Sequence, residues 1–66
     1  MEVSAKQRVE DELYELRQRI KAIMDFLYSE KVNNVSVTMK SLMHEQLRAM
    51  QEYARILTDR LAIWGL

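Results

Sequence analysis

The chain has 66 residues, and its ten Lys and Arg balance ten Asp and Glu, so its net charge is zero. So short a chain buries too little surface to be stable without disulfides, a metal or partner chains. It has no cysteine and one histidine, which excludes disulfides, thiolate metal sites and a histidine zinc cluster. We therefore expect self-association to complete its core. The absence of a basic excess argues against nucleic acid as a partner.

Hydrophobic residues make up 48% of the chain, too many for a disordered segment, yet no apolar run reaches transmembrane length. The first residues, Met1 to Ser4, lack the basic and apolar regions of a signal peptide, so we expect a cytoplasmic protein. There is no proline, and the only glycine is Gly65, which we interpret as a stop signal for the last helix. Long uninterrupted helices are therefore predicted.

The first predicted helix spans about residues 4–28. Ser4 followed by Gln7 fits a capping box, in which each side chain satisfies a backbone N–H that the helix leaves unpaired. Apolar residues then alternate at spacings of four and three, which forms an unbroken heptad seam. The seam consists of Val9, Leu13, Leu16, Ile20, Ile23 and Leu27.

Residues 29–36 form the predicted loop, in which Asn33 and Asn34 tolerate the left-handed backbone that turns require. The second helix is predicted over about 37–64, with Ser36 as its N-cap or, alternatively, Thr38 or Asn34. The β-branched residues that we expect to tuck under the hairpin tip are Val35, Val37 and Thr38.

The second helix repeats the heptad seam at the same spacing. Its seam consists of Met43, Leu47, Met50, Ala54, Leu57, Leu61 and Trp64. Because the two seams have similar length and a short loop joins them, the helices should pack against each other antiparallel. The predicted fold is an all-α antiparallel two-helix hairpin that assembles into a homo-oligomeric bundle.

A second apolar row runs along the second helix beside the first. It consists of Leu42, Ala49, Ile56 and Ile63, which recur every seven residues. A two-helix hairpin covers only one face of each helix, so this row would be an exposed apolar patch of the kind that monomers avoid. We predict that these four residues form the oligomer interface.

A polar row flanks each seam. It holds Glu12, Arg19 and Phe26 on the first helix and Gln46, Tyr53 and Arg60 on the second. The antiparallel register predicts that Glu12 lies near Arg60 and that Arg19 lies near Tyr53. Two interpretations remain open. The row is either interface packing, with an ion pair and a packed ring, or it lines an inter-subunit pocket in which arginines bind phosphate and tyrosines stack on bases.

Other polar groups are weaker candidates. Carboxylates at Glu10, Asp11, Glu12 and Glu15 are typical of a solvated helix face, and we expect neither catalysis nor a bound metal there. His44 fits a surface histidine. The predicted start of the second helix, with Lys31 and Lys40 nearby, is an alternative anion site, although capping by Ser36 or Thr38 explains the same residues.

One stretch resembles an enzyme motif. Residues Leu16 to Ile23 are similar to the opening of helical chorismate mutases, in which an arginine, here Arg17, would hold a substrate carboxylate. The chain departs from that family at Lys21, where the family has Asp, and lacks length for its third helix. We therefore expect no enzymatic activity and no cofactor.

A broader resemblance covers most of the chain. Residues Gln7 to Leu16 and Glu45 to Leu57, with Phe26-Leu27 and Ser29-Glu30 between them, resemble a family of very small bacteriophage proteins related to a crAss-like phage protein. The family has no catalytic motif from which a residue role carries over. The chain is also similar in size and architecture to phage cyclic-nucleotide sponges, which trap immune signals between subunits.

These similarities imply a host-defence antagonist that sequesters a nucleotide signal in the infected cell. The ligand would be a cyclic nucleotide or an ADP-ribose derivative at a subunit boundary. The residues that would supply guanidinium groups and stacking rings are Arg8, Tyr14, Arg17, Arg19, Tyr53 and Arg60. The alternative is a protein-binding inhibitor or adaptor that presents an exposed helix face to a host protein.

Overall fold

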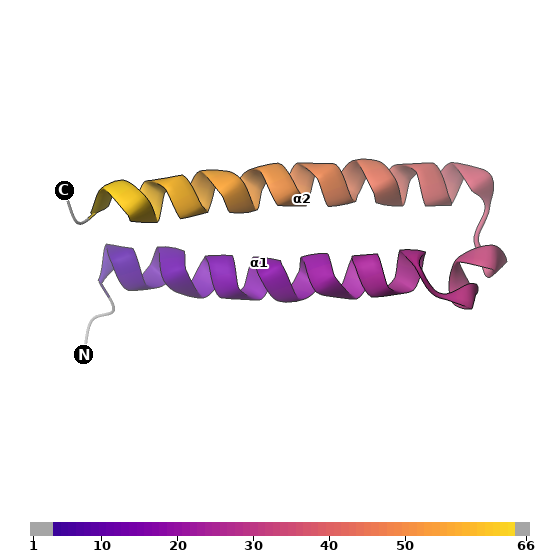
Figure 1. Cartoon of the computed structure of the whole chain (residues 1–66), viewed down its shortest axis with the longest axis horizontal. Coiled ribbons are helices and arrows are strands. Elements are labelled where there is room, and N and C mark those ends of the chain that lie inside the picture. The colour runs from indigo at the N-terminus through magenta and orange to yellow at the C-terminus, as the bar shows by residue number, and fades with distance from the viewer. Residues whose placement is uncertain (1–3, 65–66) are drawn as a thin grey trace.

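The computed structural model describes residues 4–64, which form a single helical hairpin (Figure 1). Helix α1 spans Ala5–Leu27, a short 3-10 helix η1 spans Glu30–Asn34, and helix α2 spans Val37–Trp64. The two long helices lie side by side and antiparallel, and η1 turns the chain between them. The predicted all-α hairpin is therefore confirmed. Gly65, the predicted stop signal, lies outside the described residues.

Helix α1 begins as expected at Ser4, whose hydroxyl accepts a 3.1 Å hydrogen bond from the backbone N–H of Gln7. Only this half of the predicted capping box forms. The side-chain amide of Gln7 instead donates to Asp11 one turn further along the helix, at 2.9 Å. An i, i+4 partner on the same face competes directly with the backbone N–H of the cap for the glutamine side chain.

The hairpin tip differs from the expectation. Residues 30–34 form a turn of 3-10 helix, and no non-glycine residue within 4–64 has a positive φ, so the asparagines are not used as left-handed turn residues. Val32 is buried under the tip and the expected Val35 is half-buried, whereas Val37 is 86% exposed and Thr38 is also exposed. Because η1 coils tightly, it brings Val32 inward and leaves the first turn of α2 in solvent.

Helix α2 begins with Ser36 as its cap, since the Ser36 hydroxyl accepts a 3.0 Å hydrogen bond from the backbone N–H of Met39. This interaction satisfies one of the orphan donors at the start of the helix. It also accounts for the serine at the predicted anion site without a ligand.

The core lies between the two heptad seams. Leu57 is 0% exposed and belongs to one cluster with Val9, Leu13 and Leu16 from α1. The partly buried residues that pack against this cluster are Ile20, Met50, Ala54 and Leu61. We call these facing rows the inner seam. It supplies the hydrophobic stabilisation of the hairpin, because the apolar area removed from water is concentrated there.

Beside the inner seam, about 100° further around the helix, α2 carries what we call the outer stripe. It consists of the predicted interface residues Leu42, Ala49, Ile56 and Ile63, together with Met39, Gln46, Tyr53 and Arg60, which alternate with them. All eight residues are exposed in the single chain, including Leu42 at 54% and Ile63 at 65%. Helix α1 leaves the apolar residues of this stripe exposed and reaches it only at Tyr53, which bonds to Glu12.

The hairpin is also elongated. Its dimensions are 45 × 23 × 15 Å and its radius of gyration is 15.1 Å, against about 11 Å for a compact domain of this length. Within residues 4–64, neither helix is long and apolar enough to cross a membrane.

Candidate ligand-binding residues on the two flanks of the hairpin

The inner seam divides the polar residues between two sides of the hairpin. In a heptad repeat, the positions that border the seam on either side point away from each other. One side, which we call the Tyr53 flank, carries Glu12, Tyr53 and Arg60. The other, which we call the Arg17 flank, carries Arg17 and Thr58. Each flank contains one side-chain hydrogen bond that joins α1 to α2.

On the Tyr53 flank, the phenolic hydroxyl of Tyr53 donates a hydrogen bond to the Glu12 carboxylate. This bond raises the pKa of Tyr53, because the phenol must keep its proton to donate it, and desolvation and the Glu12 charge act in the same direction. Arg60 is close enough that its positive charge opposes this rise in the pKa. Glu12, Tyr53 and Arg60 therefore form one cluster.

The predicted proximity of Glu12 and Arg60 is met in part, since both lie beside Tyr53, but the contacts that we expected on this flank differ. Among the described residues, no ion pair joins Glu12 to Arg60, and no hydrogen bond joins Arg19 to Tyr53. The Glu12 carboxylate is bound by the Tyr53 hydroxyl instead, although Glu12 lies seven residues, about two turns, before Arg19, which the register places opposite Tyr53.

A shallow hollow of about 380 Å³ lies near the end of α2, lined by Arg60, Ile63 and Trp64. It places one guanidinium beside an indole ring that is 41% exposed. Arg60 therefore borders both this hollow and the Tyr53 cluster, so a ligand there would meet a charged group and an aromatic face together.

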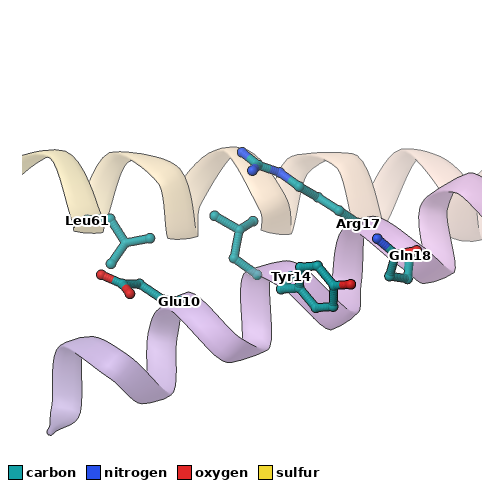
Figure 2. Close-up of a pocket in the computed structure, with 6 residues that line it drawn as sticks. Glu10, Tyr14, Arg17, Gln18 and Leu61 are labelled. Atoms are coloured by element: carbon teal, nitrogen blue, oxygen red, sulfur yellow. The ribbon is translucent and has the colours of Figure 1, made fainter.

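On the Arg17 flank, a groove of about 330 Å³ runs between the two helices (Figure 2). Figure 2 shows Arg17 extending from α1 towards α2, with Tyr14 and Gln18 beside it on α1 and Leu61 reaching down from α2. Leu13 lines the apolar part of the groove. The ring of Tyr14 is 68% exposed, so its face is accessible for stacking.

Arg17 is held in place across the groove. Its guanidinium donates a 3.4 Å hydrogen bond to the hydroxyl of Thr58, which in turn donates to the backbone carbonyl of Ala54 at 2.8 Å. Guanidinium has five N–H donors, and this contact uses one of them. The arrangement orients the arginine and leaves donor capacity for an anion in the groove.

The groove also contains an acidic group, Glu10, which would oppose an anionic ligand. The Glu10 carboxylate lies 4.0 Å from the Lys6 ammonium, one turn earlier on α1. This pair is solvent-exposed and therefore weak, but it directs part of the negative charge of Glu10 away from Arg17.

The structure thus separates the six candidate ligand residues. Tyr14 and Arg17 meet in one groove, whereas Tyr53 and Arg60 lie on the other flank. Arg19 shares the heptad row of Glu12 on that second flank, and Arg8 is exposed on α1 and lines neither hollow. No single chain brings all six together.

Sequence reasoning missed three residues of these sites. Gln18 and Thr58 line or support the groove on the Arg17 flank, and Trp64 lines the hollow at the end of α2. The sequence spacing could have identified two of them, Gln18 and Thr58. Gln18 lies four residues after Tyr14, and Thr58 is the heptad counterpart of Arg17 across the antiparallel seam.

A third set of charges lies on the surface of α2. Arg55 binds Glu52 at 2.6 Å and Asp59 at 2.6 Å. The hydrogen bond and the positive charge of Arg55 lower the pKa of Glu52, and the same bond raises the pKa of Arg55. These pairs lie one turn apart along the helix, as is usual for a solvated face. Among the described residues, no group of three His, Cys, Asp or Glu side chains is arranged to hold a metal ion.

Comparison with known proteins gives one finding. A family model described as Sequestin matches residues 4–63, nearly the whole chain. No curated protein and no solved structure shows a significant match. The family name indicates a sequestering role, in agreement with the class of small phage-type sequestering proteins that the sequence resembles.

Proposed function

We propose, because this chain belongs to the Sequestin family, that it is a non-enzymatic antagonist of host defence. In this proposal, a homo-oligomer of the hairpin sequesters a nucleotide immune signal at its subunit interfaces. The protein acts in the cytoplasm of an infected bacterial cell, and the ligand is a cyclic nucleotide or an ADP-ribose derivative. A sequestering protein needs affinity and abundance but no reactive group, so the absence of a catalytic motif is consistent with this role.

The observation that carries the proposal is the groove between Tyr14 and Arg17. It combines an accessible aromatic ring with an oriented guanidinium. Stacking of one base contributes about 1–3 kcal/mol, and a hydrogen bond to a charged phosphate contributes about 1.5–3 kcal/mol. One groove therefore offers the two interactions that a nucleotide requires, although it is open and shallow when the chain is alone.

Association supplies what the single groove lacks. In a closed symmetric oligomer, each contact made by one copy is repeated by the others. A second chain that closes the groove would add its own basic residues and exclude water from the phosphate. Among the remaining candidates, Arg8 and Arg19 would take part through such neighbouring copies.

The groove is tested by calorimetric titration of the protein with a panel of cyclic di- and trinucleotides and cyclic ADP-ribose isomers. We expect at least one of them to bind. Tyr14→Ala and Arg17→Ala should each weaken binding by about tenfold or more, which corresponds to about 1.4 kcal/mol or more.

The chain offers matched controls for both variants. Tyr28→Ala and Arg48→Ala alter an exposed tyrosine and an exposed arginine away from the groove, and both should bind like wild type. Binding of no member of the panel would overturn the nucleotide proposal. Equal losses in all four variants would show that the groove is not the site.

A second candidate function is favoured by the exposed outer stripe of α2. If the stripe stays uncovered in the oligomer, the protein is better suited to bind a host protein as an inhibitor or adaptor. Retention of a specific host protein on the immobilised chain, combined with no nucleotide binding, would support this second function.

A further inference from the structure

The outer stripe of α2 is a second heptad seam. From Met39 to Ile63 its residues alternate at spacings of three and four, the same pattern that packs the inner seam. The stripe is about 37 Å long, given a rise of about 1.5 Å per residue. Such a repeat is suited to pack against another helix of equal length, and α1 is already used by the inner seam.

We propose that a second copy of this chain covers the outer stripe, with the two α2 helices antiparallel and a two-fold axis level with residues 51 and 52. This proposal rests on the self-association included in the proposed function, and it does not depend on nucleotide binding. The pair is a four-helix arrangement in which each α1 remains on its own α2.

The exposed area of the chain supports a partner of this size. The chain exposes 5463 Å², whereas a compact monomer of its mass, 7.9 kDa, exposes about 4,400 Å². The excess of about 1,000 Å² is close to the roughly 800 Å² that each partner contributes to a standard protein–protein interface.

The stripes of two antiparallel copies are complementary in shape. With the two-fold axis level with Gln51, the small Ala49 of each copy faces the large Tyr53 of the other, and Met39 faces Ile63. The charged Arg60 lies opposite Leu42 near the end of the seam, where its guanidinium reaches solvent. Pairing small with large side chains fills the layers without cavities.

A parallel pair lacks this complementarity. It would place Arg60 against its own copy, which is a repulsive contact, and Ala49 against Ala49, which leaves a gap. The antiparallel register with the axis level with Gln51 also uses the full stripe. Shifting that register by one heptad would leave about a quarter of the stripe unpaired.

The charges beside the stripe make a specific prediction about this axis. An acidic row of Glu45, Glu52 and Asp59 borders the stripe. Antiparallel pairing brings Glu52 near its own copy, and Glu45 near Asp59 of the other copy. Arg55, which binds both Glu52 and Asp59, offsets part of this repulsion.

The pairing also distinguishes the two sets of candidate ligand residues. Tyr53 and Arg60 belong to the outer stripe and would be covered by the second copy. Tyr14 and Arg17 lie on the other flank of the hairpin, which this copy does not cover. The interface therefore assigns Tyr53 and Arg60 to assembly and leaves the groove on the Arg17 flank to the ligand.

The experiment uses single cysteines, which is straightforward because the chain has none of its own. Each variant is oxidised or treated with a short bis-maleimide, without nucleotide. Glu52→Cys should cross-link to itself. Glu45→Cys and Asp59→Cys should not link to themselves, since each would lie about 21 Å along the axis from its own copy. A mixture of Glu45→Cys with Asp59→Cys should link.

The alternatives give different results. A parallel pair would place each cysteine level with its own copy, so all three variants would cross-link alike, which would overturn the proposal. A monomeric mass by light scattering, with no cross-linking at all, would overturn it as well. Cross-linking in the predicted pattern by a chain that binds no nucleotide would refute the nucleotide proposal and leave the interface intact.

A second measurement keeps the test independent of cysteine chemistry. Glu52→Gln removes the like charges beside the axis, so it should tighten self-association by a few-fold and reduce its dependence on salt. Glu15→Gln, which removes a charge from an exposed position of α1 outside both hollows, should leave the dissociation constant unchanged. Weaker association of Glu52→Gln would contradict the antiparallel axis.

Discussion

Helix α2 carries two apolar surfaces with the same heptad period, and they differ in what covers them. On the inner seam, α1 removes Leu57 from solvent completely, whereas on the outer stripe Ile56, one residue earlier, remains exposed. In both surfaces the residues alternate at spacings of three and four with equal regularity. The comparison teaches that a heptad period predicts that a surface has a partner, while chain topology decides whether the partner belongs to the same chain.

The two surfaces also have different energetic roles, because the inner seam stabilises the single chain and the outer stripe drives its association. The inner seam must hold the hairpin together with only a few fully buried side chains, so the single chain has little reserve. Within the isolated hairpin, the outer stripe contributes only the hydrogen bond of Tyr53 to Glu12. Its apolar residues stabilise the fold through association, and that contribution depends on concentration by mass action.

The largest effect is expected on the inner seam. Leu57→Ala removes the most buried side chain of the core and should cost about 2–5 kcal/mol, most of the roughly 3–10 kcal/mol available to a domain of this length. Urea unfolding followed by circular dichroism measures the loss. Leu42→Ala, on the outer stripe, is the matched control and should leave a dilute chain nearly unchanged. Equal losses in the two variants would remove the distinction between the surfaces.

The next effect concerns the outer stripe. Ile56→Glu should dissociate the assembly, because a buried and unpaired carboxylate is costly. The melting temperature should then stop rising with protein concentration and should stay at the low value of the isolated hairpin. Size exclusion with light scattering gives the mass. Gln51→Glu adds the same charge on the side of α2 that faces away from the stripe, since Gln51 lies two residues from both Ala49 and Tyr53, and this variant should still associate. A monomeric wild-type chain with a cooperative transition would contradict this prediction.

The smallest effect concerns the hydrogen bond between Tyr53 and Glu12. Tyr53→Phe should lower stability at neutral pH. The pKa of Tyr53 is raised above its ordinary 10.0 in the folded chain. The stabilisation is therefore fully present below pH 10 and is lost as the pH rises through the raised value. Chemical denaturation across pH 7–11.5 should show a decline in wild type that Tyr53→Phe lacks. Tyr28→Phe, at the exposed tip, should follow the wild-type profile.

Much of the fold was predictable because it depends on local pattern. Alternating apolar spacing predicts both long helices, and Ser4 and Ser36 are recognisable caps because a serine hydroxyl satisfies a backbone N–H in any sequence. The two facing seams predict the core, including Leu57. These features require only the period of the helix and the antiparallel arrangement.

The contacts beside the seam were less predictable. The register allowed Glu12 to meet either Arg60 or Tyr53, and the choice depends on side-chain reach, which heptad position does not specify. The tip was missed for a similar reason. Whether Val32 or Val37 is buried depends on how tightly the connection coils, and both residues are equally apolar in the sequence.

The position of Trp64 has a practical consequence. It is the only tryptophan in the chain, and it lies partly exposed beside Arg60 and Ile63, at the end of the surface that we assign to a second copy. Its fluorescence therefore comes from one place in the molecule. A blue shift of its emission with rising concentration would report assembly in real time, without a label, and would give the kinetics of pairing directly.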